Sequence, residues 1–180
     1  MIRLGVNVDH IATLRQVRGG TTPYPDLLYF VKESVKGGAD LITIHLREDR
    51  RHIQLQDLVL LSKKCPVPLN LEMAATDAMT KLNIAEHFSR MKKVTQKLKT
   101  AGTKVSHFIE PSELQVQKSF ECGADAVEFH TGHWVLLRSK AKKKEYYRLE
   151  KAALKAHNLG LNVHAGHGLD YEHTKIIRKL

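Results

Sequence analysis

A short unit that recurs along the chain limits its fold more than any other feature. Four times, a glycine follows a helix-like stretch and an apolar run begins two or three residues later. Such a glycine suits the left-handed residue after a helix C-terminus, and the spacing is typical of helix-to-strand loops in α/β units. The apolar runs after these glycines are 41–46, 104–109, 126–130 and 162–165. Because the runs are separated by helical stretches, they predict an α/β fold with a parallel sheet.

Two further apolar runs, 4–7 and 68–73, bring the number of predicted strands to six. Helices are predicted where apolar residues recur with helical spacing, and one of them opens at Pro111. The predicted helices span 26–36, 85–100, 111–120, 144–158 and 171–180.

Alternation within the strands separates an aliphatic face from a polar one. In 41–46, Ile42 and Ile44 alternate with Thr43 and His45. The same strand is followed by the polar Arg47, and the polar positions of the other strands, mostly at their C-terminal ends, are Asn7, Asp9, Asn70, Glu72, Glu128 and His130. A buried polar residue costs a few kcal/mol unless it is paired, so a set of this size indicates a site. Parallel barrels carry their chemistry at the C-terminal ends of the strands.

Two histidines do not follow this pattern. His107 shares a face with Val105 and Ile109, and His164 shares one with Asn162 and Gly166. Both are predicted to be structural or incidental and not to act as ligands or bases.

Composition narrows the class of protein. The 180 residues are 42% apolar and carry no apolar run near the roughly 18 residues of a membrane span. One domain over 1–180 is expected, and the N-terminus has no signal-peptide layout. Cys65 and Cys122 show no metal or redox spacing, which suits a reducing cytoplasm. We therefore expect a cytoplasmic protein without a membrane partner.

The net charge of +10 suits anionic partners such as phosphorylated metabolites, nucleic acid or acidic membranes. Aromatic and basic residues are not interleaved as single-stranded nucleic acid binding requires, so no nucleic acid partner is expected. Part of the excess lies in a run that is predicted to be the solvated entrance of a helix. This run consists of Lys140, Lys142, Lys143 and Lys144.

Four segments, taken in this order and spacing, carry a resemblance to a known family. They are Gly5–Arg15 followed by Arg18, Thr43–Ile53, Asn70–Ala74, and Ala165–Leu169 downstream of Glu128–Gly132. Together they resemble the pyridoxine 5'-phosphate synthase family of the deoxyxylulose-dependent vitamin B6 pathway. The resemblance covers nearly the whole chain, and the second segment is its most specific part.

The resemblance implies a (β/α)₈ TIM barrel and a ring-closing condensation. The family joins 3-amino-2-oxopropyl phosphate and 1-deoxy-D-xylulose 5-phosphate into pyridoxine 5'-phosphate, releasing inorganic phosphate and water. It implies no metal and no organic cofactor, and it implies a homo-oligomer, up to an octamer. Such chemistry needs repeated proton transfers, which histidine and a desolvated carboxylate supply near neutral pH.

The resemblance also implies roles for single residues. His45 and Glu72 would be proton acceptors, and His167 a proton donor. Arginine suits phosphate because its planar fork donates two hydrogen bonds at once, whereas Arg50 and Arg51 are predicted to be a surface loop pair. The substrate contacts would be Asn7, Asp9, His10, Arg18, Arg47, His52 and the backbone N–H of Gly168.

The chain also departs from the family pattern. A (β/α)₈ barrel has about 250 residues, against 180 here. The fourth strand and a loop that contributes a substrate contact are expected to be missing between Lys81 and Leu82, and the eighth strand after Leu180. Three explanations stay open: the numbering omits residues that exist, the chain is a deliberate fragment, or the gene product is truncated and inactive.

Three other functions remain open beside the synthase. An inactive truncated barrel would bind phosphorylated ligands without turnover. Another phosphate-handling barrel, such as an aldolase or isomerase, is disfavoured because no inward lysine ends a strand for Schiff-base chemistry. Nucleic-acid binding would show itself by a steep salt dependence of affinity.

Overall fold

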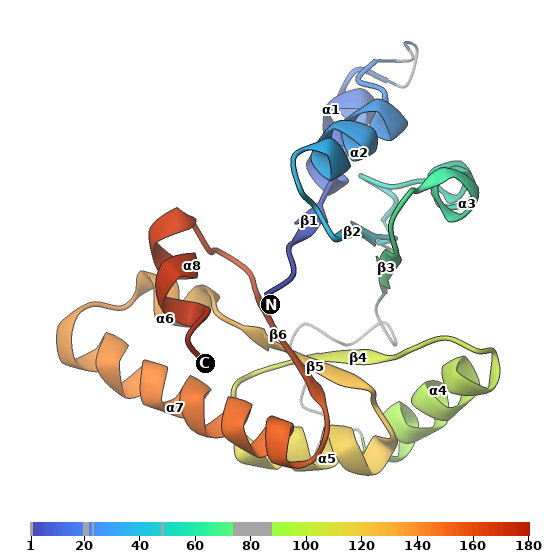
Figure 1. Cartoon of the computed structure of the whole chain (residues 1–180). Helices are drawn as coiled ribbons and strands as arrows, with labels where there is room; N and C mark the ends of the chain where they lie inside the picture. The colour runs from blue at the N-terminus through green and yellow to red at the C-terminus, as the bar shows by residue number, and fades with distance from the viewer. Residues whose placement is uncertain (1, 20–21, 23, 48, 74–87) are drawn as a thin grey trace. The chain divides into compact units, whose positions relative to one another are not determined.

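The computed structural model describes residues 2–19, 22, 24–47, 49–73 and 88–180. The chain divides into two compact units, Met1–Asp77 and Ala78–Leu180, here called the N-terminal unit and the C-terminal unit. Each unit contains a three-stranded parallel sheet, in the orders β1-β2-β3 and β4-β5-β6 (Figure 1).

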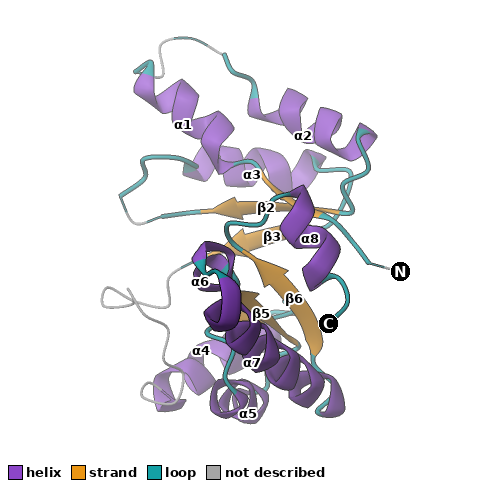
Figure 2. Cartoon of the chain, turned by 90° about the vertical axis from the view of Figure 1, so that its left-hand side faces the viewer, coloured by secondary structure: helices purple, strands orange, loops and turns teal. Residues whose placement is uncertain are grey.

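The N-terminal unit alternates strands and helices. Its elements are β1 (Gly5–Asn7), α1 (Asp9–Val17), α2 (Leu27–Lys36), β2 (Leu41–His45), α3 (Leu55–Lys64) and β3 (Leu69–Glu72). The helices lie on one side of the sheet (Figure 2). Asp26 caps α2 by accepting hydrogen bonds from the backbone N–H groups of Leu28 and Tyr29, as N-cap residues do.

The core of the N-terminal unit forms where the aliphatic strand face meets the helices. Ile42 and Ile44 of β2 are fully buried, as are Val31 of α2 and Leu61 of α3. Burial of one such side chain contributes about 1.5–3 kcal/mol to folding. The predicted separation of aliphatic and polar faces is therefore confirmed on β2, the central strand of this sheet.

The C-terminal unit repeats the alternation with longer helices. Its elements are α4 (Phe88–Thr100), β4 (Ser106–Ile109), α5 (Glu113–Cys122), β5 (Ala126–His130), α6 (Gly132–Leu136), α7 (Ser139–Asn158), β6 (Asn162–Gly166) and α8 (Tyr171–Ile177). Val127 and Phe129 of β5 are buried together with Val116 of α5 and Leu149 of α7. In both views α4, α5 and α7 lie along the same side of the sheet (Figures 1 and 2).

The six predicted strands are all present and parallel. The α/β class with parallel strands within each sheet is thus confirmed, and it is compatible with a TIM-like fold; the described strands form two three-stranded sheets, one in each unit. The expected gap at Lys81 and Leu82 falls on residues 74–87, which lie outside the described part of the chain.

The predicted helices differ from the observed ones mainly at their starts. The helix predicted at Pro111 begins at Glu113, because Ser112 takes the extended N-cap conformation. The helix predicted from Lys144 begins at Ser139, so the lysine run lies within its first turns and not before it. The sequence did not predict α1, α3 and α6.

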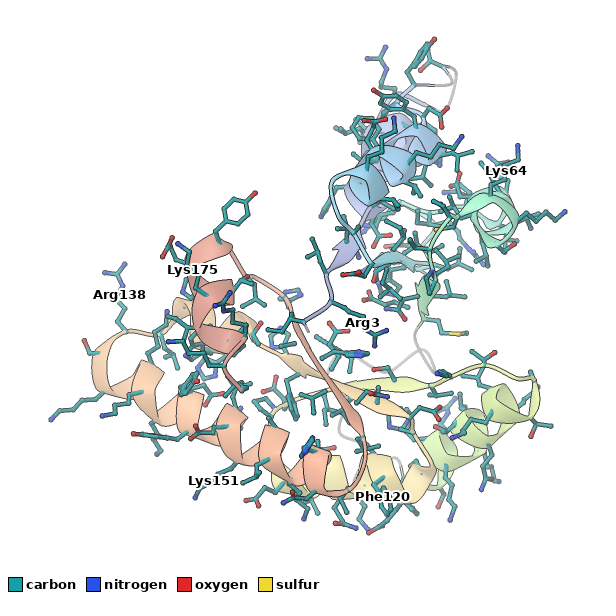
Figure 3. All side chains as sticks on the ribbon, in the orientation of Figure 1. Arg3, Lys64, Phe120, Arg138, Lys151 and Lys175 are labelled. Carbon is teal, nitrogen blue, oxygen red and sulfur yellow. The ribbon has the colours of Figure 1, made fainter. Side chains whose placement is uncertain are left out.

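Three of the four lysines in that run are exposed, as expected for a solvated helix entrance. Lys142 is different: its Nζ donates to the carbonyl of Val135 (3.2 Å), contacts Nε2 of His173 (2.8 Å) and lies over the Trp134 ring. This lysine therefore fastens α7 to α6 and α8. Arg138, Lys151 and Lys175 are other basic side chains of this unit (Figure 3).

Among the helices that the structure describes, none combines the length and the apolar character needed to cross a membrane.

Candidate active site

The polar strand ends of the N-terminal unit lie in matching register. Asn7 pairs with Thr43, and Thr43 pairs with Asn70, whose Nδ2 donates to the Thr43 hydroxyl oxygen (3.3 Å). Two residues further along both strands, His45 pairs with Glu72. Because residues in register point to the same side of a parallel sheet, these side chains form two successive polar layers.

Asp9 connects the ends of β1 and β2. Its backbone N–H donates to Oδ1 of Asn7 (2.8 Å), and its Oδ2 accepts from Nδ2 of Asn7 (3.1 Å). Its Oδ1 accepts from the backbone N–H of His45 (2.8 Å). The carboxylate is 8% exposed, so it is committed to holding Asn7 and His45 in place.

His45 and Glu72 are neighbours suited to proton transfer. His45 Nδ1 lies 3.9 Å from Oε2 of Glu72. Burial lowers the pKa of His45, Arg47 lowers it further, and Asp9 acts in the opposite direction. A lowered pKa keeps the imidazole neutral at physiological pH, the form in which it accepts a proton.

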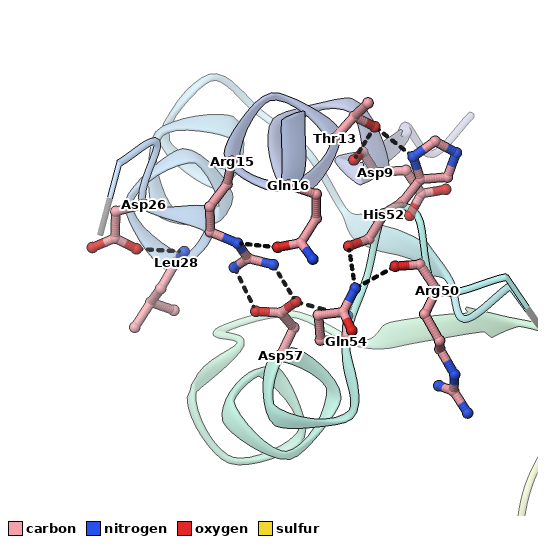
Figure 4. Close-up of polar contacts among 10 residues, drawn as sticks. All are labelled: Asp9, Thr13, Arg15, Gln16, Asp26, Leu28, Arg50, His52, Gln54 and Asp57. Carbon is pink, nitrogen blue, oxygen red and sulfur yellow. Dashed lines mark hydrogen bonds and ion pairs between the residues drawn. The ribbon is translucent and has the colours of Figure 1, made fainter. Parts of the chain in front are cut away.

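The segment after β2 is fastened to α1 at two points (Figure 4). Arg15 makes a two-pronged ion pair with Asp57, at 2.8 and 2.7 Å. Thr13 Oγ1 lies 2.6 Å from Nδ1 of His52. The His52 ring also meets the His10 ring edge-on, with centroids 5.8 Å apart. The structure thus brings His10 and His52 together.

The predicted arginine contacts are less closely grouped. Arg47 is half-buried and its Nε lies 3.5 Å from Oδ1 of Asp49. Arg18 is exposed at the C-cap of α1, about 13 Å along the helix from Asp9 at 1.5 Å per residue. Arg50 and Arg51 are exposed, as expected for a surface pair, although Arg51 also contacts His52.

In the C-terminal unit, His167 and Gly168 form a tight turn after β6. Both have positive φ, 81° and 76°, a conformation that is uncommon for a residue with a side chain. The buried Thr131 holds this turn, because its hydroxyl lies 2.7 Å from the carbonyl of Gly166 and 2.8 Å from that of His167. The surrounding structure therefore fixes His167 in a strained backbone conformation.

The His167 ring belongs to an aromatic cluster on the strand ends. Its centroid lies 4.7 Å from that of His130 and 6.5 Å from that of Phe108. His130 Nδ1 lies 3.4 Å from Oε1 of Glu110. Burial lowers the pKa of His130, and His167 lowers it further, whereas Glu110 raises it.

Glu128 points toward Gly166 on the next strand. A Cβ at position 166 would overlap Oε1 of Glu128, so a side chain there would force this carboxyl group to move. Burial raises the pKa of Glu128, which favours its protonated, hydrogen-donating form. The sequence placed Glu128 and His130 in the polar set that indicates a site, through their parity with His45 and Glu72, but gave neither residue a role of its own.

The two histidines set aside from the sequence have different surroundings. His107 is buried and its Nε2 lies 2.9 Å from the Thr95 hydroxyl of α4, so the predicted structural role is confirmed. His164 is exposed and in register with Glu128, so it lies on the polar side of β6, and the prediction that it departs from the polar pattern is wrong. Its structural role stays a prediction.

The amino-acid sequence is similar to known proteins over nearly its whole length. The family model described as pyridoxal phosphate biosynthesis protein PdxJ matches residues 4–84 and 80–180. A protein of Bdellovibrio bacteriovorus is 58% identical over 204 aligned positions, covering 99% of this chain and 85% of its own length. A Photobacterium profundum protein is 41% identical, covering 99% and 84%, and a Zymomonas mobilis protein is 41% identical, covering 96% and 77%. All three are named pyridoxine 5'-phosphate synthase.

Proposed function

The chain belongs to the PdxJ family of pyridoxal phosphate biosynthesis proteins and is a pyridoxine-forming enzyme, and we propose how its described residues carry the reaction. The enzyme condenses 3-amino-2-oxopropyl phosphate with 1-deoxy-D-xylulose 5-phosphate, giving pyridoxine 5'-phosphate, inorganic phosphate and water. The observation that supports this function most directly is 58% identity to a named synthase over 99% of the chain.

In the N-terminal unit, His45 and Glu72 are the proposed proton acceptors. Condensation of an amine with a ketone, followed by dehydration and enolisation, removes protons from nitrogen and carbon in succession. The neutral state of His45 and its position 3.9 Å from the Glu72 carboxylate support this pairing. Asp9 supports it indirectly, because its carboxylate fixes the end of β2 that carries His45.

In the C-terminal unit, His167 is the proposed proton donor. A donor is required when hydroxyl groups leave as water, and His130 and Thr131 support this role by holding the turn and the ring. Glu128 is a second candidate donor, because its raised pKa favours the protonated carboxyl group.

The remaining predicted residues are proposed to bind the two substrates. Arg18 and Arg47 are the proposed phosphate-binding cations, and the positive φ of Gly168 places its backbone N–H in a turn beside His167. Asn7, Asp9, His10 and His52 complete the set. For Asp9 the hydrogen bonds favour positioning of Asn7 and His45 over direct substrate contact.

We further propose a single barrel over residues 1–180, a homo-oligomer and a cytoplasmic location. The alignment with the Bdellovibrio protein spans 204 positions, so it contains positions at which this chain of 180 residues has no counterpart. The family model matches the chain in two pieces that overlap at residues 80–84. This break in the match supports the expected gap at Lys81 and Leu82. The alternative function is an inactive barrel that binds phosphorylated ligands without turnover. The intact mass of the protein distinguishes the active synthase from the inactive barrel. A mass several kDa above 20.4 kDa would mean that the expected segments exist.

Replacing Glu72 by glutamine tests the proposed chemistry. Glu72→Gln keeps the shape and hydrogen-bonding capacity of the side chain but cannot take up a proton. We expect substrate binding to stay within about twofold and kcat to fall by about 10²–10⁴, the range of one general base.

Glu33→Gln, on the exposed face of α2, is the matched control and should keep full activity. Wild-type kcat in Glu72→Gln would show that Glu72 is not the base. Phosphate binding without turnover in the unaltered protein would support the inactive barrel.

A further inference from the structure

The surroundings of His52 determine which of its ring nitrogens carries the proton. Nε of the Arg51 guanidinium lies 3.1 Å from Nε2 of His52 and always bears a hydrogen, so it is the donor and Nε2 is the acceptor. A neutral imidazole has one N–H group, and with Nε2 accepting, that group must be at Nδ1.

Thr13 is the partner of that N–H group. Its Oγ1 lies 2.6 Å from Nδ1 of His52 and 3.1 Å from the carbonyl oxygen of Asp9, one turn earlier in α1. Nδ1–H therefore donates to the hydroxyl oxygen, and the hydroxyl proton goes to the Asp9 carbonyl. In this series of hydrogen bonds from Arg51 to Asp9, each hydrogen has one acceptor. With the proton on Nε2 instead, that N–H group would face the N–H group of Arg51.

The backbone of His52 is held as well. Nε2 of Gln54 donates to the carbonyl oxygen of His52 (3.2 Å), and the backbone N–H of Gln54 donates to Asp57 (2.8 Å), the partner of Arg15. Figure 4 shows these contacts beside those that Thr13 and Arg15 of α1 make with His52 and Asp57. Because Gln54 holds the backbone of His52, the contact of Thr13 Oγ1 with Nδ1 sets the orientation of the His52 ring.

We propose that Thr13 is a positioning residue for His52, holding the ring with the proton on Nδ1 and the Nε2 lone pair directed at Arg51. The charged and titratable groups that act on this ring are Arg51, Arg47, His10 and Asp9. Burial and the two arginines lower the pKa of His52, which agrees with a neutral ring. The functional consequence rests on the proposed function, in which His52 contacts a substrate.

The tautomer is measured without any substrate. In the full chain with ¹⁵N-labelled histidine, long-range ¹H–¹⁵N spectra at pH 8 distinguish Nδ1–H from Nε2–H, and His52→Gln identifies the signal. We expect Nδ1–H in the wild type and in Thr13→Ser, and a shift of the population toward Nε2–H in Thr13→Val. A wild-type ring that is mainly Nε2–H, or a Thr13→Val spectrum like the wild type, would overturn the proposal.

Kinetics then test whether the position matters for binding. We expect Thr13→Val to raise KM about tenfold, the effect of one lost hydrogen bond, with kcat within about twofold and with Thr13→Ser close to wild type. In a His52→Gln background Thr13→Val should have no further effect, because both changes act on the same ring. A full additional loss there would show that Thr13 acts elsewhere. A protein without synthase activity would contradict the proposed function and leave the tautomer result to decide this proposal.

Discussion

The two units hold polar strand ends in place by different means. In the N-terminal unit the means are hydrogen bonds and an ion pair. Asp9 accepts hydrogen bonds from Asn7 and His45, and Arg15 forms an ion pair with Asp57. In the C-terminal unit no ion pair holds the described turn after β6; its means are the Thr131 hydroxyl, ring contacts around His167 and the absence of a side chain at Gly166. Both arrangements fix the end of a parallel strand, but the first depends on paired charges and the second on available space.

This difference determines what each unit tolerates. A hydrogen-bonded arrangement is sensitive to loss of a partner, because the remaining charge stays buried without compensation. An arrangement defined by space is sensitive to added atoms, because close-packed interiors have no room for another methyl group.

The largest effect is expected for removal of a charge from the N-terminal unit. Arg15→Met leaves the Asp57 carboxylate, whose side chain is 5% exposed, without its cation. Loss of one partner of a buried ion pair costs about 3–5 kcal/mol. Hydrogen exchange at the backbone amides of β1, β2 and β3 should show this loss as reduced protection.

The control for Arg15→Met is Lys36→Met. It removes an ion pair with Glu33 in the same unit, in which the Lys36 side chain is 72% exposed, and we expect little change in protection. Equal protection in both variants would mean that the Arg15 pair does not stabilise this unit, and the comparison between the units would fail on that side.

The second effect concerns space in the C-terminal unit. Gly166→Ala puts a methyl group where Oε1 of Glu128 lies, so the carboxyl group has to move. Displacement of a reacting group by about 1 Å costs on the order of 100-fold in rate, and we expect a loss of this size in kcat with a stability close to wild type.

Gly5→Ala on β1 is the matched change in the other unit. Its nearest atom is the flexible end of Leu41 at 3.3 Å, which can adjust, so we expect nearly normal turnover. If Gly166→Ala is as active as Gly5→Ala, Glu128 has no role that depends on its position.

Much of this fold follows from local sequence. Each of the six predicted strands is observed, and 126–130 has the predicted bounds, because glycine punctuation and alternation are local signals. Of the three helices that were not predicted, α3 carries a local signal, the capping box of Gln54 and Asp57, that was not used, whereas α1 and α6 lack such signals. Val8 before α1 makes no side-chain cap, and α6 has only five residues and starts at Gly132, too short for a helical period.

The site was predictable where residues share a strand parity and less so where it depends on packing. The pairing of His45 with Glu72 follows from parity and register. The role of Thr13 does not, because its partner His52 lies 39 residues away and the contact depends on how α1 meets the following segment. The crowding of Glu128 against Gly166 likewise requires the register of β5 with β6.

The smallest effect concerns acid sensitivity of the C-terminal unit, where packing buries His107. Burial lowers the pKa of His107 to about 4, against about 6.5 in the unfolded chain. Between these values the unfolded state binds the proton and the folded state does not. Stability therefore falls as pH falls from about 6.5 to about 4, and about 2 kcal/mol should be lost between pH 7 and pH 5.

Urea unfolding at both pH values measures this loss, followed by the fluorescence of the single tryptophan, Trp134, which is buried in the C-terminal unit. His107→Gln is the matched variant, because its amide can replace the contact of Nε2 with the Thr95 hydroxyl and does not titrate. We expect the variant to lose less stability on acidification than the wild type. If the wild type and His107→Gln lose the same stability, the acid sensitivity comes from other groups. Burial of His107 would then not distinguish the C-terminal unit from the N-terminal unit.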